Sequence, residues 1–143
     1  MRTISLLTVI CLISGMLSCQ KKKEDVPEAV KVSFQKKYPG EDDPDWEKDD
    51  HGYWESHFKK KGEKYRADFK ADGTWVETEN DIKKQNLPDA IKKVIREKYS
   101  KLEITEVEHV LNAKKGEFYD VEFKQKGKNK DIMFRKDGTE MNE

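Results

Sequence analysis

YWESHFKKKGEKYRADFKADGTWV, which runs from Tyr53 to Val76, decides the fold, because the chain repeats its pattern as FYDVEFKQKGKNKDIMFRKDGTEM from Phe118 to Met141. In both copies a Lys-Gly pair separates two apolar runs, and an Asp-Gly-Thr tripeptide follows the second run. An earlier match joins VPEAVKVSFQKKY at Val26–Tyr38 to LPDAIKKVIREKY at Leu87–Tyr99. Self-similarity of this kind indicates a duplicated unit, here one helix followed by strands.

The segments Val26–Tyr38 and Leu87–Tyr99 are each predicted to form an amphipathic helix. Their apolar residues recur at steps of three and four, which places them on one stripe of the helix surface. Pro27 and Pro88 suit the first helical turn, and Pro39-Gly40 ends the first helix. Each helix should therefore bury one side against the strands that follow it.

The repeated aromatic segments are predicted to form antiparallel strands, because apolar and polar residues alternate in them. The pairs Asp72-Gly73 and Asp137-Gly138 favour the positive φ angles of tight hairpins. An additional leading strand is expected in each unit, around Trp46 in the first and Val107 in the second.

These elements predict an α+β fold, a tandem duplication of a helix plus three or four antiparallel strands. Repeat 1 covers residues 26–80 and repeat 2 covers 87–143. The two units are expected to share one antiparallel sheet, with both helices on one face and the other face open.

The amino-terminal residues resemble a bacterial lipoprotein signal. Arg2 precedes an apolar run that is too short to span a bilayer, and Met16-Leu17-Ser18-Cys19 resembles the motif at which a cysteine is acylated. We expect residues 1–18 to be a signal peptide, Cys19 to be lipidated and residues 19–25 to form a charged tether before the domain at 26–143. Plain cleavage, with Cys19 left as a free thiol, is the alternative.

Lipidation would attach the protein to a membrane without spanning it, either facing the periplasm or on the outer surface. Cys11 lies in the signal segment and no cysteine follows Cys19, so the mature chain can form no internal disulfide. Basic and acidic residues number 29 each; loss of Arg2 leaves 29 − 1 = 28 basic groups. This balance gives no reason to expect binding to nucleic acid, which needs a basic face. Charged residues at 41% against apolar ones at 34% indicate a thin core.

The duplicated helix start, the aromatic hairpin and the terminal Asp-Gly-Thr together resemble the PepSY-like, β-lactamase-inhibitor-like proteins of the bacterial envelope. The resemblance covers essentially the whole mature chain. It implies a non-enzymatic fold that holds another protein or a peptide on its sheet. Whether it also inhibits that partner stays open. The β-lactamase inhibitors themselves carry disulfides and this mature chain cannot, so inhibition of that enzyme does not follow from the resemblance.

The side chains opposite the helix-facing set define the predicted open face of the sheet. Aromatic residues, methionine and arginine are enriched in protein interfaces, which favours this face as a contact surface. Isolated aromatics on a solvated sheet, serving only cross-strand pairing, are the alternative. The predicted binding residues are Tyr53, His57, Arg66, Trp75, Phe118, Met133 and Arg135.

Nothing in the sequence indicates catalysis or a cofactor. It has no glycine-rich phosphate loop, and His51, His57 and His109 do not recur at matching repeat positions. The acidic stretch Glu41–Asp45 lacks the glycine of a calcium loop and is expected to be a solvated loop. A small-ligand or metal-sensing lipoprotein and a purely structural envelope protein are the alternatives to a protein-binding module.

Overall fold

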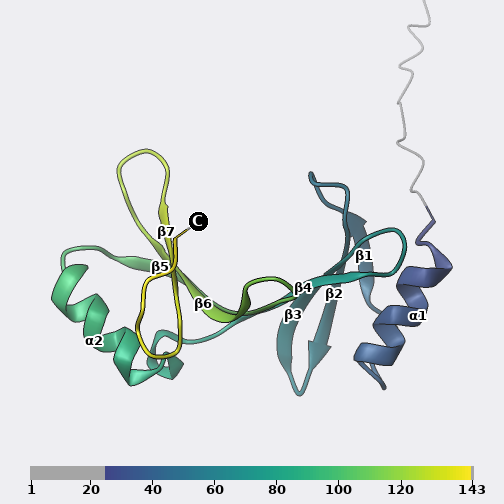
Figure 1. The fold of residues 1–143 in the computed structure, drawn as a ribbon, viewed down its shortest axis with the longest axis horizontal. Coiled ribbons are helices and arrows are strands. Elements are labelled where there is room, and N and C mark those ends of the chain that lie inside the picture. The colour runs from purple at the N-terminus through teal and green to yellow at the C-terminus, as the bar shows by residue number, and fades with distance from the viewer. Residues whose placement is uncertain (1–24, 143) are drawn as a thin grey trace, which may run out of the picture.

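The structure, a computed structural model, describes residues 25–142 and consists of two helices and seven strands (Figure 1). The predicted signal peptide and the acylation site Cys19 lie outside the described residues. Neither described helix is long and apolar enough to cross a membrane. The elements are α1 (Glu28–Lys37), β1 (Asp45–Lys48), β2 (Trp54–Lys60), β3 (Glu63–Phe69), β4 (Trp75–Asp81), a 3₁₀ turn (Lys84–Asn86), α2 (Asp89–Lys98), β5 (Ile104–Asn112), β6 (Gly116–Phe123) and β7 (Lys130–Phe134).

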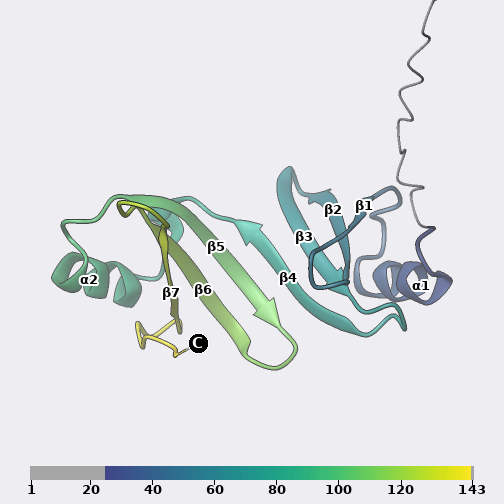
Figure 2. The same ribbon diagram turned by 90° about the horizontal axis from the view of Figure 1, so that it is seen from above.

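The seven strands form one antiparallel sheet in chain order, β1 to β7. Each strand pairs with the next, including β4 with β5, although α2 lies between those two strands in the sequence. The predicted α+β class and single antiparallel sheet are confirmed, and so are the two leading strands β1 and β5. Helices α1 and α2 lie near opposite ends of an elongated molecule, with β4 and β5 between them (Figure 2).

Two separate apolar clusters form the core, one for each helix. In the first, the Phe34 ring of α1 meets Phe58 edge-on with centroids 5.1 Å apart. In the second, Ile91 of α2 is fully buried, as is Phe134 of β7. Burying such side chains contributes about 1.5–3 kcal/mol each. The first cluster comprises Val30, Phe34, Tyr38, Trp54, Phe58, Ala67 and Phe69. The second comprises Leu87, Ile91, Val107, Tyr119, Val121, Phe123, Ile132 and Phe134.

Gly73 of the Asp-Gly turn adopts the predicted positive φ, +84°, and Gly62 of the preceding hairpin turn has a φ of +86°. In the Asp72-Gly73 turn, the Thr74 backbone N–H donates to the Asp72 carboxylate at 2.8 Å. The Asp137-Gly138 turn repeats this arrangement. Both turns lie against a helix, since a Cβ on Gly73 would meet the Ala29 carbonyl oxygen of α1.

Trp75 was predicted to lie on the open face, and the structure corrects this. Its indole packs against the α1 cluster, Nε1 donates to the Thr78 hydroxyl at 2.9 Å, and the Lys37 ammonium lies 3.5 Å from the ring centroid. The cause is a bulge: Phe69 pairs with Trp75 while Asp68 pairs with Glu77, so strict alternation breaks between these pairs. A bulge of one residue moves a side chain to the other face.

Candidate binding face

The strand register divides the sheet side chains into two sets. One set contains both core clusters. The other set, which we call the open face, is dominated by carboxylates that come from every strand between β2 and β7. In strands β2 to β7 its members are Glu55, His57, Lys59, Lys64, Arg66, Asp68, Glu77, Glu79, Asp81, Glu106, Glu108, Val110, Asn112, Phe118, Asp120, Glu122, Asp131 and Met133.

The predicted binding residues differ in where the structure places them. His57, Arg66 and Met133 lie on the open face and are partly exposed. Tyr53 immediately precedes β2, where its backbone N–H donates to the Asp49 carboxylate at 2.7 Å. Arg135 follows β7. The structure thus brings together only part of the predicted set.

Arg135 and Phe118 do not offer the free groups that the sequence suggested. The Arg135 guanidinium donates to the carbonyl oxygens of Lys115 and Glu117, at 2.6 and 2.9 Å. Phe118 belongs to the open face by register but is only 4% exposed, so it is not an available anchor. The Lys115 ammonium lies 5.9 Å from its ring centroid and 3.6 Å from the Met133 sulfur.

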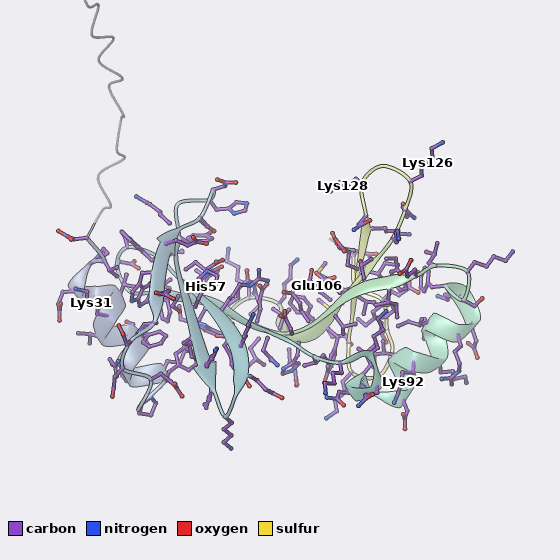
Figure 3. All side chains as sticks on the ribbon, turned by 180° about the vertical axis from the view of Figure 1, so that it is seen from behind. Lys31, His57, Lys92, Glu106, Lys126 and Lys128 are labelled. Carbon is purple, nitrogen blue, oxygen red and sulfur yellow. The ribbon has the colours of Figure 1, made fainter. Side chains whose placement is uncertain are left out.

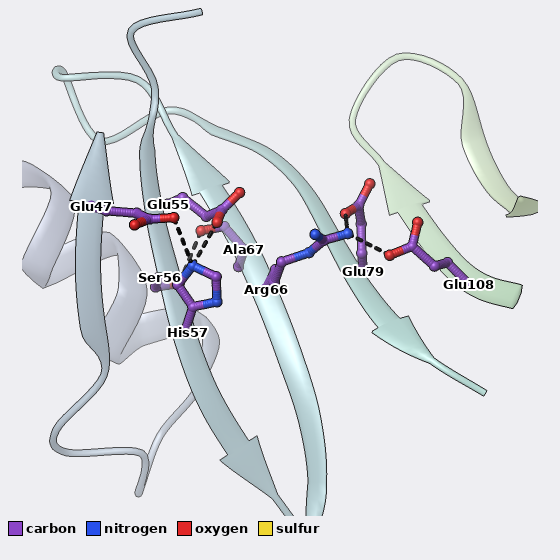
Figure 4. A network of polar contacts seen from close by, with 8 residues as sticks. All are labelled: Glu47, Glu55, Ser56, His57, Arg66, Ala67, Glu79 and Glu108. Carbon is purple, nitrogen blue, oxygen red and sulfur yellow. Dashed lines mark hydrogen bonds and ion pairs between the residues drawn. The ribbon is translucent and has the colours of Figure 1, made fainter. Parts of the chain in front are cut away.

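An ion bridge crosses the middle of the open face. Arg66 on β3 donates through Nη2 to Glu79 on β4, at 2.6 Å, and to Glu108 on β5 (Figure 4). Burial and then the Glu79 charge raise the pKa of Glu108 to about 7, although the Arg66 charge opposes the rise. Burial also raises the pKa of Glu79. One guanidinium therefore holds two carboxylates but does not fully offset their desolvation.

Asp68 lies beside this bridge without a cation of its own. Its cross-strand neighbours are Glu55 on β2 and Glu77 on β4, both acidic. Its Oδ1 atom is buried and accepts no hydrogen bond within the described part of the chain. Burial, followed by the charges of Glu55 and Glu77, raises the pKa of Asp68 to about 7. An unpartnered carboxylate oxygen in such a place is costly to keep ionised.

Asp120 on β6 repeats this situation in the second half of the sheet. Its Oδ1 atom is also buried and unpartnered among the described residues. Burial and then the neighbouring Asp131 charge raise its pKa, while a hydrogen bond from the Val121 backbone and the Lys115 charge oppose the rise. Beside it lies a hollow of about 250 Å³ whose described lining consists entirely of carboxylates: Glu106, Glu108, Asp120, Glu122 and Asp131. The site is suited to positive charge and unsuited to an anion.

Two groups of described residues could hold a metal ion. His57 Nε2 lies 3.2 Å from a Glu47 oxygen and 2.6 Å from a Glu55 oxygen (Figure 4). The second group is Asp81, Glu106 and Glu108, whose ligand atoms lie within 4.8 Å of one another. Both groups are exposed or partly exposed, and such clusters are common without an ion. The loop Glu41–Asp45 does not form such a group.

The acidic character of β5 is the part of the face that sequence reasoning missed. Glu106 and Glu108 were not predicted to belong to it, although Val107 was expected in a core strand. Alternation from Val107 would have placed both glutamates on the opposite face. Their pairing with Glu122 and Asp120 was not visible in the sequence. Figure 3 shows Glu106 over the middle of the molecule, whereas Lys31 and Lys92 lie on the helices and Lys126 and Lys128 at a loop tip.

Known proteins resemble the chain in both sequence and fold. Residues 52–141 match the PepSY-like family, described as β-lactamase-inhibitor-like. A Bacteroides fragilis structure described as a BLIP-like protein is 21% identical, with a TM-score of 0.73; the match covers 83% of this chain and 85% of that one. A DUF2874 family protein of Bacteroides ovatus is 22% identical, with a TM-score of 0.73 and coverage of 83% and 87%.

A Bacteroides eggerthii protein described as periplasmic is 20% identical, with a TM-score of 0.71 and coverage of 83% and 88%. At these identities the structures establish a shared fold and nothing more. No curated protein matches the chain.

Proposed function

Because the chain belongs to the PepSY-like, β-lactamase-inhibitor-like family, we propose that it is a non-enzymatic protein of the bacterial envelope that binds another protein or a peptide through the open face. The observation that carries the proposal is a continuous seven-stranded sheet whose two apolar clusters lie on the same side by register. The other side presents polar groups from six neighbouring strands, and two of its carboxylate oxygens have no partner in the described chain.

The proposal includes a tandem duplication in which both helices cover one sheet face. Two packing contacts support it. A Cβ on Gly73 would lie 2.5 Å from the Ala29 carbonyl oxygen of α1, and a Cβ on Gly138 would lie 3.0 Å from the Ala90 carbonyl oxygen of α2. Each unit thus packs its Asp-Gly turn against its own helix, at matching repeat positions.

We further propose that the protein is anchored by a lipid on Cys19 and faces the periplasm. The sequence around Cys19 and the periplasmic description of the Bacteroides eggerthii relative support this. Cys19→Ala is expected to leave an unprocessed precursor without acyl chains. Fractionation and gel mobility identical to those of the wild type would contradict lipid anchoring.

The Bacteroides fragilis relative is described as BLIP-like, which favours recognition of a protein over recognition of a small molecule. We extend that mode of recognition to this chain and do not extend the target. The described residues contain no cysteine, so the disulfides of the β-lactamase inhibitors are absent from this domain. We therefore propose binding by the sheet face. The identity of the captured protein will show which activity the partner has.

The binding proposal is tested with the full-length protein, tagged at its carboxyl terminus and captured from envelope extracts. A partner retained by the wild type should be lost from His57→Ala/Met133→Ala, because both side chains lie on the open face. The matched control is Val32→Ala/Leu111→Ala. Val32 on α1 is 57% exposed, and Leu111 is 41% exposed on the other sheet face.

The control variant should retain the partner as the wild type does. Equal retention by all three baits, or loss from the control alone, would contradict binding through the open face. Failure of every bait to retain a protein would favour a ligand-sensing or a structural role over protein binding.

A further inference from the structure

The charges of this protein are segregated although they balance overall. Lys and Arg residues number 29, as do Asp and Glu residues. On the open face carboxylates outnumber the cations Lys59, Lys64 and Arg66, and Arg66 is already occupied by Glu79 and Glu108. The labelled lysines lie on the helices and the β6–β7 loop (Figure 3). The open face therefore carries a concentrated negative charge that the rest of the molecule offsets elsewhere.

We propose that the open face binds an extended segment rich in lysine or arginine, whose cationic side chains bind the free carboxylate oxygens of Asp68 and Asp120. This inference rests on the proposed function and adds the chemical class of the partner. It commits to a basic polypeptide, and a free divalent cation is an outcome of the test.

Charge complementarity excludes the other polypeptide classes. An acidic segment would bring like charges together, which costs several kcal/mol at an interface. A neutral, apolar segment would remove the remaining water from Asp68 and Asp120 without supplying a donor, and buried unpaired charge is strongly unfavourable. A lysine or arginine supplies both the donor and the countercharge, in a charge-assisted hydrogen bond.

The depth of the two free oxygens favours a long cationic side chain. Both Oδ1 atoms are buried, while the neighbours Glu55, Glu77 and Asp131 stand around them. Lysine and arginine carry their charge on long aliphatic stems, which suits them to reach the Asp68 and Asp120 carboxylates past such neighbours. A small ion could enter the same places but would not link them.

The separation of the two sites favours an extended segment. Asp68 on β3 and Asp120 on β6 lie three strands apart. Asp68 pairs with Glu77 on β4, whereas Asp120 is aligned, through Glu108, with Asp81 on β4, so the two sites are offset by four residues along the strands. With about 4.8 Å between strands and about 3.3 Å per residue, the sites are about 20 Å apart, the span of about six extended residues. An even spacing puts both cations on the same side of an extended chain.

The test uses the full-length protein in detergent and three fluorescent eight-residue peptides, (Lys-Thr)₄, (Gln-Thr)₄ and (Glu-Thr)₄, followed by anisotropy. We expect saturable binding of the lysine peptide, weakening as salt is added, and none of the other two. Asp68→Asn/Asp120→Asn should weaken it about tenfold or more. The matched control, Glu28→Gln/Glu97→Gln, makes the same charge change at exposed helix positions and should stay within about twofold.

Equal weakening by both double variants would show a nonspecific charge effect and overturn the proposal. Binding of the glutamine peptide that is lost with Met133→Ala but unchanged in Asp68→Asn/Asp120→Asn would also overturn it, while leaving the proposed function intact. Saturable calcium binding that depends on the same two aspartates, without binding of the lysine peptide, would assign the face to an ion. Binding of no probe would overturn this inference, and the capture experiment would still decide the proposed function.

Discussion

Gly73→Ala is expected to lower the free energy of unfolding by about 2–4 kcal/mol. Gly73 has φ of +84°, which an alanine adopts only with strain. The added Cβ would also lie 2.5 Å from the Ala29 carbonyl oxygen and 2.8 Å from the Ser33 hydroxyl of α1. The backbone atom cannot move without shifting α1, so the turn and the helix must separate. Urea unfolding followed by circular dichroism measures the change.

Gly62→Ala is the control, because Gly62 has nearly the same φ, +86°, but its Cβ would meet nothing within 4 Å. It should cost only the conformational strain, about 1 kcal/mol. The difference between the two variants isolates the contact of the β3–β4 turn with α1. Equal costs would mean that this turn does not pack on the helix.

Asp68→Asn is expected to stabilise the protein at pH 8 and to leave its stability at pH 4 nearly unchanged. The pKa of Asp68 is raised from 3.8 to about 7, mainly by burial. Between these values the folded state binds a proton that the unfolded state has released, so stability falls as the pH rises through this window. Asparagine cannot ionise, so the variant does not lose stability as the pH rises through this window.

The gain at pH 8 should be about 1–2 kcal/mol, well below the full value of the shift, because Asp68 is partly exposed and solvent screens its charge. Chemical unfolding at pH 4, 6 and 8 measures it. Asp42→Asn, on the exposed loop before β1, is the control and should change stability by less than about 0.5 kcal/mol at any of these values. A gain independent of pH, or a loss at pH 8, would show that Asp68 is not desolvated by the sheet.

Most of the fold could be predicted from local patterns. The stripe of apolar residues predicted α1 and α2, and alternation predicted the strands, because each element buries a single side. The Asp-Gly pairs predicted turns because they favour positive φ, and the Lys-Gly pairs predicted turns because they separate two apolar runs.

The candidate site was less predictable, because it depends on pairing between strands. Trp75 was assigned to the wrong face because one bulge, invisible in the sequence, breaks the alternation of β4. Phe118 was assigned to the correct face, but its burial was missed. The acidic surroundings of Asp68 and Asp120 depend on which residues face these two side chains across the strands, and this register is a tertiary property.

The central claim is that the open face holds a polypeptide partner, and site-specific photo-cross-linking in living cells tests it most directly. A photo-reactive phenylalanine analogue is placed at His57 or Met133 on the open face, and at Val32 or Leu111 as exposed positions elsewhere. We expect a discrete cross-linked adduct from His57 and Met133 and none from Val32 and Leu111. Adducts from Val32 or Leu111 alone, or the same adducts from all four positions, would contradict it.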